Sequence, residues 1–303
     1  MQLAITGATG HIGGQVARLL SDQGLPLILP LILPLRNPSR APRLPDCEPR
    51  PFSYGDFELA REALQGVDAL FMVSAAESPT REQEHLTLVR AAQAAGIQHL
   101  VYLSFAEARP DSTFTLARTH AITEEAIRRS TMKHTFVRDN FYSELMARLA
   151  DAEGVICGPA EQGRVACVAQ RDAAQAVANI MADIAAGGTQ HQGRTYTLTG
   201  NQSLSMEDIA RILTTCTGKP HRFHNETIAE AFASRRAAYP DTPDWEIEAW
   251  VSTYTAIAKG ELAQVTQDLP RLIGREPLTF EQVVTEMANS PAAVSAPRDS
   301  GKP

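Results

Sequence analysis

The sequence has few cysteines and no strong excess of either charge. Its 303 residues contain four cysteines, Cys47, Cys157, Cys167 and Cys216, which are too scattered for a metal site or a small disulfide framework. The formal net charge of −7 argues against nucleic-acid binding, because that function needs a basic surface to neutralise phosphates. We therefore expect no nucleic-acid partner and a reduced, cytoplasmic setting.

The sequence also lacks a hydrophobic run long enough to cross a membrane. The first residues, MQLAITGATGHIG, carry no basic leader, so we expect no targeting segment. The run LPLILPLILPL at 25–35 is shorter than the roughly 20 apolar residues that a bilayer requires, and its prolines would interrupt a helix. We expect no membrane span, although the repeat LILPLILP leaves the exact strand register open.

The composition that remains is that of a globular α/β protein. Hydrophobic residues make up 44 % and charged residues 21 % of the chain. The apolar run 2–6 is typical of a buried parallel strand, and a glycine turn and a helical pattern ending at Gly24 follow it. Strand, turn and helix in this order predict a loop that binds the diphosphate of a dinucleotide at Gly7, Gly10 and Gly13. The alternative is that the three glycines only turn the chain.

An arginine follows the second predicted strand. In a dinucleotide-binding fold this position selects the cofactor, since a carboxylate there binds the ribose of NAD whereas an arginine can bind the 2′-phosphate of NADP. We predict the strand at LILPL, 31–35, and assign NADP selection to Arg36, with Arg40 further on. Pro34 is unfavourable inside such a strand, because it has no N–H to donate to a neighbouring strand. A solvated surface arginine is the alternative for Arg36.

The later pattern predicts a doubly wound parallel sheet. Strands are expected at 51–53, 68–73, 99–103 and 134–138, with helices at 58–65, 80–95 and 115–130 between them. We predict a Rossmann domain over 1–150, a smaller α+β substrate lobe over 151–288 and a disordered tail over 289–303. In the lobe we expect strands at 164–169 and 195–198, helices at 170–186, 205–217, 228–238 and 245–259, and a near capping box at Ser205 and Asp208.

Several motifs occur together in a familiar order. They are TGATGHIG at 6–13, LRNP at 35–38, YGD at 54–56, GV at 66–67, AAGI at 94–97 and RDNFYSE at 138–144. With them the chain resembles the NmrA-like branch of the atypical short-chain dehydrogenases over about residues 2–285, especially its type 2 NADPH:quinone oxidoreductases and triphenylmethane reductases.

The resemblance implies a set of cofactor-binding residues. The pyrophosphate would lie on the glycine loop, and Arg36 would meet the 2′-phosphate of NADPH. Asp56 and Phe57 would lie near the adenine. The glycine loop comprises Gly7, Thr9, Gly10, His11, Ile12 and Gly13. The ribose and nicotinamide would be flanked by residues at the ends of two strands and by a later segment, namely Ser74, Ala75, Ala76, Leu103, Ser104, Asn140 and Phe141. His120 falls where longer relatives carry an active-site lysine.

The scarcity of lysine limits the chemistry. The chain has four lysines, and none lies four residues after a tyrosine, so the Tyr-x-x-x-Lys pair of classical short-chain dehydrogenases is absent. We therefore predict an NADPH-dependent oxidoreductase that transfers hydride to a small conjugated acceptor. A quinone is the acceptor that we favour. His120 would be the proton donor or a ribose ligand, and Phe105, Phe141 and Tyr142 would form an apolar wall. An exposed helical histidine and ordinary core aromatics are the alternatives.

A second hypothesis is a redox sensor that binds NAD(P) without turnover and reports to a protein partner. The cofactor loop would be the same in both cases. We predict no metal site, because none of the histidines has a second ligand at metal-binding spacing, and Ser104 lacks the setting of a nucleophile. We expect a monomer or homodimer.

Overall fold

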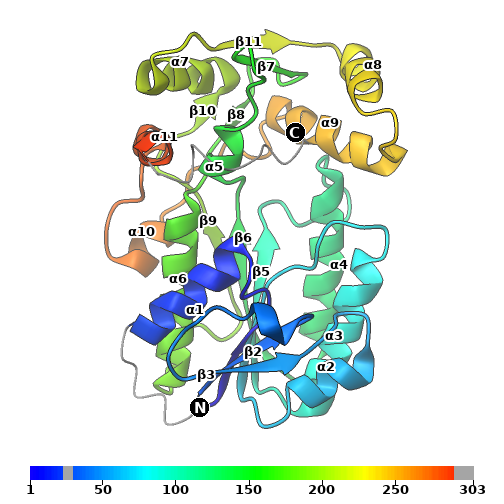
Figure 1. Cartoon of the computed structure of the whole chain (residues 1–303), viewed down its shortest axis with the longest axis vertical. Coiled ribbons are helices and arrows are strands. Elements are labelled where there is room, and N and C mark those ends of the chain that lie inside the picture. The colour runs from blue at the N-terminus through cyan, green and yellow to red at the C-terminus, as the bar shows by residue number, and fades with distance from the viewer. Residues whose placement is uncertain (23–29, 290–303) are drawn as a thin grey trace.

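A seven-stranded parallel sheet forms the centre of the molecule (Figure 1). The computed structural model describes residues 1–22 and 30–289. The strand order is β3-β2-β1-β4-β5-β6-β9, and every neighbouring pair is parallel. The predicted doubly wound α/β fold is thus confirmed, with strands β1 (Leu3–Ile5), β2 (Leu31–Leu35), β3 (Cys47–Pro51), β4 (Ala69–Met72), β5 (His99–Phe105), β6 (Lys133–Asp139) and β9 (Arg194–Leu198).

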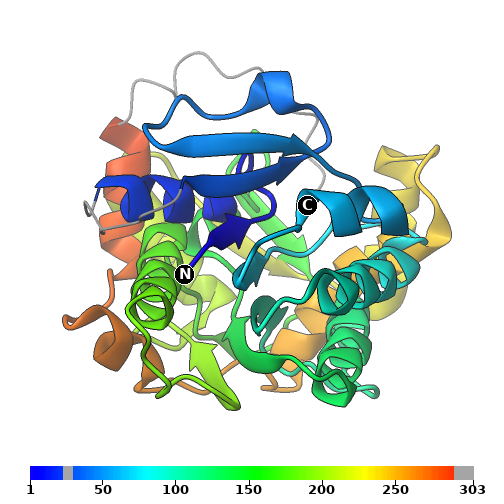
Figure 2. The same ribbon diagram turned by 90° about the horizontal axis from the view of Figure 1, so that it is seen from below.

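Helices cover both faces of this sheet, as the end-on view in Figure 2 shows. Successive strand residues point to opposite faces, so each strand contributes to two cores. Ile5 and Phe71 belong to one core, and Ala4 and Leu70 belong to the other. The first face carries α1 (His11–Asp22), α6 (Gln170–Ala185) and α10 (Asp268–Ile273), and the second carries α2 (Phe57–Ala63), α3 (Arg81–Ala95) and α4 (Thr115–Arg129).

Strand β2 has the predicted bounds and is buried along its whole length. It pairs with β3 over five residues, from Leu31–Cys47 to Leu35–Pro51, so β3 begins earlier than the predicted strand at 51–53. The ladder to β1 has the single register pair Ala4–Ile32. Because Pro34 has no N–H to donate toward β1, the proline shortens that ladder and leaves the one to β3 intact. The start of the repeat, residues 27–29, lies outside the described residues.

A third core lies beyond the carboxyl ends of the central strands and combines elements mainly from the later half of the chain. Ile156, Ile209 and Ile257 pack there, together with Phe105 and Phe141 from the sheet. The predicted N-cap is confirmed as a full capping box between Ser205 and Asp208. The elements of this part are α5 (Ser143–Met146), β7 (Val155–Gly158), β8 (Arg164–Val165), β10 (Leu204–Ser205), α7 (Met206–Thr217), β11 (Arg222–Asn225), α8 (Ile228–Ala238), α9 (Asp244–Ala258) and α11 (Phe280–Asn289).

The chain crosses between the two parts more than once. α6 packs on α1, and β9 pairs with β6 in the main sheet, although both lie beyond residue 150. A boundary at residue 150 therefore remains a proposal about the two cores and does not describe the sheet. Apart from Asn289, which ends α11, the predicted tail at 289–303 lies outside the described residues. Within residues 1–22 and 30–289, no helix is long and apolar enough to cross a membrane.

Candidate active site

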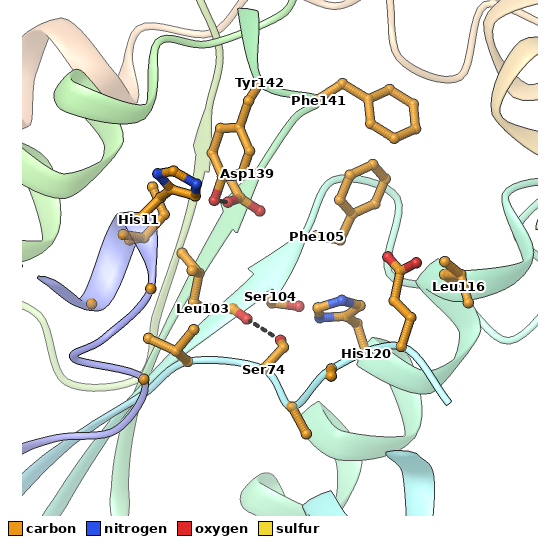
Figure 3. A pocket seen from close by; sticks show the side chains of 18 of the residues that line it. His11, Ser74, Leu103, Ser104, Phe105, Leu116, His120, Asp139, Phe141 and Tyr142 are labelled. Atoms are coloured by element: carbon orange, nitrogen blue, oxygen red, sulfur yellow. Dashed lines mark hydrogen bonds between the residues drawn. The ribbon is translucent and has the colours of Figure 1, made fainter. Parts of the chain in front are cut away.

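A cavity of about 420 Å³ opens at the carboxyl ends of the central strands. The strand order reverses between β1 and β4, and open α/β sheets bind their ligands at such a reversal. We call this space the main cavity. It is lined by Gly7, Gly10, His11, Ile12, Gly13, Val73, Ser74, Ala75, Ala76, Glu77, Arg81, Leu103, Ser104, Phe105, Phe114, Leu116, His120, Asp139, Asn140, Phe141, Tyr142, Leu145 and Gln170. Ten of them are labelled in Figure 3.

The glycine loop forms one rim of the main cavity. Gly7 has a φ of +67°, which favours glycine, and a Cβ there would lie 3.1 Å from the Cβ of Val73. A Cβ on Gly13 would lie 2.5 Å from the Gly7 carbonyl oxygen, so only glycine lets α1 approach the loop this closely. The first N–H groups of α1 have no partner within the helix and can hold an anion. The loop thus fits the diphosphate of a dinucleotide.

A second cavity, of about 360 Å³, lies on the other side of the same loop. We call it the arginine cavity, since it is lined by Ala8, Thr9, Gly10, His11, Gln15, Arg18, Arg40 and Pro42. Arg36 is exposed immediately after β2 and lines neither cavity, whereas Arg40 ends the short helix η1 (Pro38–Arg40) that follows. Arg18 and Arg40 therefore border the loop on this side, which suits a further phosphate.

The residues predicted to lie near the adenine have a structural task. Asp56 is the N-cap of α2, and its Oδ1 accepts a hydrogen bond of 3.0 Å from the Leu59 N–H. Phe57 is the first residue of that helix. Neither Asp56 nor Phe57 lines the main cavity or the arginine cavity.

Three phenylalanines form a wall of the main cavity. The ring centroids of Phe105 and Phe114 are 5.0 Å apart, and the Phe141 ring lies 5.1 Å from each of them. Figure 3 shows Phe105 and Phe141 on the side of the cavity opposite His11. We call these rings the phenyl wall. It offers an apolar surface for a flat aromatic molecule.

A network of histidines and a buried arginine lies beside the phenyl wall. Nη2 of Arg81 donates a hydrogen bond of 2.8 Å to Nε2 of His120, because a guanidinium has no acceptor atom. Nδ1 of His120 therefore carries the hydrogen and donates to the Tyr102 hydroxyl at 2.9 Å. Burial lowers the pKa of His120 well below its usual value, and the charge of Arg81 lowers it further.

His85 continues this network in the same protonation state. The backbone N–H of Ala75 donates to its Nε2 at 2.9 Å, so its Nδ1 carries the hydrogen toward Thr123 at 2.9 Å. Burial, with a smaller contribution from Arg81, lowers the pKa of His85 to about 3. Both imidazoles are neutral at ordinary pH. Both ring nitrogens of His120 thus have partners inside the protein, Arg81 and Tyr102, and its role as proton donor or ribose ligand stays a prediction.

A carboxyl–phenol pair stands at the opposite end of the main cavity. The Tyr142 hydroxyl donates a hydrogen bond to Oδ2 of Asp139, and Figure 3 places both next to His11. Burial raises the pKa of Asp139 to about 7, although the Tyr142 hydrogen bond and the charge of Arg81 act in the other direction. A carboxyl with such a pKa can hold or release a proton near neutral pH.

Ser104 belongs to an ionic cluster under the cavity floor. Its hydroxyl donates to Oε1 of Glu124 at 2.7 Å, and Glu124 also pairs with Arg138 at 2.7 Å and Arg128 at 2.6 Å. The Glu124 side chain is fully buried. These contacts link β5, β6 and α4, and they direct the Ser104 hydroxyl to a carboxylate that two arginines already hold.

The main cavity brings together most of the residues predicted for the site. It includes the predicted loop glycines, His11, Ile12, Ser74, Ala75, Ala76, Leu103, Ser104, Phe105, His120, Asn140, Phe141 and Tyr142. Thr9 lines only the arginine cavity, and Arg36, Asp56 and Phe57 line neither. Sequence reasoning missed Arg81, Asp139, Glu77 and Phe114. Arg81 could not stand out, because an arginine at the start of a helix is usually solvated.

Metal-ligating side chains do not gather anywhere in the described part of the chain. Among residues 1–22 and 30–289, no group of three or more His, Cys, Asp or Glu could hold a metal ion. The features that line the main cavity are the glycine loop, the phenyl wall and the buried charged residues.

Comparison with known proteins agrees with this geometry. Residues 7–184 match a family described as NAD(P)H-binding. Quinone oxidoreductase 2 of Escherichia coli (strain K12) is 30% identical over 95% of this chain and 99% of its own. A (4-alkanoyl-5-oxo-2,5-dihydrofuran-3-yl)methyl phosphate reductase of Streptomyces griseus is 32% identical over 95% of this chain and 98% of its own.

The solved structures lead to the same group. The crystal structure of the NADPH-dependent quinone oxidoreductase of Escherichia coli, complexed with NADPH, superposes with a TM-score of 0.85 at 30% identity. It covers 95% of this chain and 100% of that one. The chain therefore belongs to the NAD(P)H-binding, NmrA-like family of atypical short-chain dehydrogenases and is an NAD(P)H-dependent oxidoreductase.

Proposed function

We propose that this enzyme uses NADPH to reduce a small, planar, conjugated acceptor, and that quinones are its acceptor class. The observation that carries the proposal is the phenyl wall, which faces the same cavity as the glycine loop. A flat aromatic acceptor can stack on these rings while the cofactor occupies the loop end. The two relatives named above are reductases, and one of them is a quinone oxidoreductase.

The charges around the glycine loop support NADPH as the cofactor. Arg36 stands where a carboxylate would select NADH, and Arg18 and Arg40 line the arginine cavity next to the loop. These side chains can meet the extra phosphate of NADPH. The NADPH in the crystal structure of the Escherichia coli relative agrees with this choice.

The chain supplies binding and orientation, while bound NADPH supplies the hydride. Residues Gly7–Gly13 would hold the diphosphate, and Ser74–Ala76, Leu103, Ser104 and Asn140 would border the ribose and nicotinamide. Tyr142 and the phenyl wall would orient the acceptor and exclude water. Asp139, whose pKa lies near neutrality, can hold a proton beside the site.

The direct test is NADPH oxidation in the presence of quinones. Purified protein is mixed with NADPH and a series of benzoquinones and naphthoquinones, and the loss of nicotinamide absorbance is followed against a protein-free control. We expect turnover well above the uncatalysed rate, and faster turnover for flat bicyclic quinones than for bulky substituted ones.

The same assay separates the enzyme from a sensor. Tight NADPH binding without turnover of any acceptor would reject the proposed function and favour the redox sensor. Turnover of a dye or butenolide, but of no quinone, would keep the reductase and replace its acceptor class.

A further inference from the structure

Arg81 is a buried cation that lines the site and forms no ion pair with a described carboxylate. It is the first residue of α3, its exposed fraction is 5%, and it lines the main cavity. Among residues 1–22 and 30–289 it forms no ion pair with a carboxylate, and its Nε has no hydrogen-bond partner. A buried charge without a partner is costly, so its position needs a reason other than stability.

The His120 ring holds this cation and does not neutralise it. Nε2 of His120 accepts from Nη2 of Arg81, and the Tyr102 hydroxyl accepts from Nδ1 of the same ring. In both hydrogen bonds the accepting atom belongs to an uncharged group. The guanidinium is therefore fixed in direction and keeps its full positive charge.

The carboxyl groups of Glu77 and Asp139, on which the charge of Arg81 acts, do not pair with that charge either. Arg81 acts on Glu77 and Asp139 through space, without an ion pair to either. Burial raises the pKa of Asp139 to about 7, so this carboxyl holds a proton part of the time near neutral pH, and Glu77 is an exposed residue that water screens. The cavity thus contains an oriented guanidinium that no protein anion occupies.

We propose that Arg81 is a catalytic residue that stabilises the oxyanion formed on the acceptor during its reduction. This inference rests on the proposed function. Bound NADPH would supply a hydride to one carbonyl oxygen of the quinone and become NADP⁺; the π electrons move through the ring to the other carbonyl oxygen, and that second oxygen becomes anionic. When the product meets solvent, the oxyanion takes a proton from water, which gives the hydroquinone and hydroxide. A preorganised cation in a cavity that excludes water lowers the barrier of such a step.

The position of Arg81 fits this role. The His120 ring, to which Arg81 is hydrogen-bonded, lies 6.2 Å from the Phe105 ring between centroids, so the imidazole that holds the guanidinium lies beside the phenyl wall. A flat acceptor on that wall would direct an oxygen from its edge toward Arg81. Figure 3 shows His120 and Phe105 on the same side of the cavity.

The test compares Arg81→Met with Arg81→Lys and with the control Arg90→Met. Arg90 is an exposed residue of the same helix, bonded to Thr87. With neutral 1,4-naphthoquinone we expect Arg81→Met to lower kcat by about 100-fold or more, Arg81→Lys to retain part of the rate, and Arg90→Met to match the wild type. Guanidinium ions added to Arg81→Ala should restore part of the lost turnover.

The outcomes separate this role from simple binding. An unchanged kcat in Arg81→Met would overturn the proposal, and so would a loss confined to the KM of a sulfonated naphthoquinone. An equal loss of NADPH affinity would assign Arg81 to the cofactor and would overturn it too. If the wild type reduces no quinone, the proposed function fails first, and the two failures are distinguishable.

A measurement on the wild type needs no substitution. In the presence of NADP⁺, the protein should bind the anion of 2-hydroxy-1,4-naphthoquinone about 10-fold more tightly than neutral 1,4-naphthoquinone, because the anion resembles the charged product. Equal affinities would contradict the proposal even if every Arg81 variant failed to fold.

Discussion

The glycine loop separates two regions with opposite ways of using charge. On the side where we propose that the adenosine binds, Arg18, Arg36 and Arg40 are exposed. On the side proposed for the acceptor, Arg81, His120 and Asp139 are buried, and hydrogen bonds hold each of them in place. Exposed charges are screened by water and contribute little until a ligand arrives, whereas buried charges act strongly on their neighbours. We infer that the first region recognises the cofactor and the second performs the reaction.

The largest effect is expected from the buried ionic cluster below the cavity. Glu124→Leu would leave Arg138 and the Ser104 hydroxyl without their partner, and we expect a loss of about 3–5 kcal/mol in the free energy of unfolding. Urea unfolding measures this loss. The neighbouring Glu125→Leu is the control, because Glu125 pairs with Arg129 at an exposed position and should cost no more than about 1 kcal/mol. Equal losses would remove the distinction between buried and exposed charge.

The next effect is a pH dependence that comes from Asp139. Its pKa is about 7 in the folded chain and close to 3.8 when exposed, so between these values the folded state holds a proton that the unfolded state has lost. Stability from this group therefore falls as the pH rises from about 4 to 7. Asp139→Asn should remove that dependence and raise the free energy of unfolding at pH 8 by about 2–4 kcal/mol.

The difference between wild type and Asp139→Asn should vanish near pH 4, where both side chains are neutral. An asparagine can still accept the hydrogen bond from Tyr142, so the substitution changes mainly the charge. Urea unfolding at the two pH values checks this expectation. A constant difference between the two variants at both values would show that Asp139 is not the titrating group.

A smaller effect is expected on the adenosine side. Arg36→Ala should weaken NADPH binding by about 10-fold and NADH binding by no more than about 2-fold, because an exposed arginine interacts with the 2′-phosphate alone. Fluorescence titration of the two cofactors measures both constants. The same substitution at Arg40, on the arginine cavity, tests how the two side chains share the phosphate. Equal losses for NADPH and NADH would reject the role of Arg36.

The smallest effect concerns Asp56. Removal of this N-cap in Asp56→Ala should cost about 1 kcal/mol of stability, since the Leu59 N–H loses its partner. Thermal unfolding measures it. A purely structural role leaves the affinity for both cofactors unchanged, whereas the predicted position near the adenine would weaken NADPH and NADH equally.

The comparison also explains what the sequence could predict. The glycine loop and Arg36 follow directly from the ends of strands, so local pattern is enough to find them. Arg81 and Asp139 depend on how α3, α4 and the strand ends pack together, which no spacing in the sequence indicates. His120 was predicted in the site, and its exposed alternative is wrong because the side chain is 7% exposed. Its hydrogen bond to Arg81 could not be predicted, because it depends on the same packing.

Other expectations lie beyond what the fold determines. The cytoplasmic setting and the monomeric or homodimeric state stay predictions. The division at residue 150 stays a prediction too. α6 packs on α1 and β9 pairs with β6, and the sequence could not show this, since short helices and strands after a break in rhythm do not reveal which core they join.

The most direct test measures two quantities on two variants. The dissociation constant of NADPH and the single-turnover rate of hydride transfer to 1,4-naphthoquinone are determined for Arg36→Ala and Arg81→Met. We predict that Arg36→Ala raises the dissociation constant by about 10-fold and leaves the rate of the bound complex within about 2-fold, while Arg81→Met does the reverse and lowers the rate by about 100-fold. If both variants change binding and rate alike, the separation of recognition from chemistry across the glycine loop is wrong.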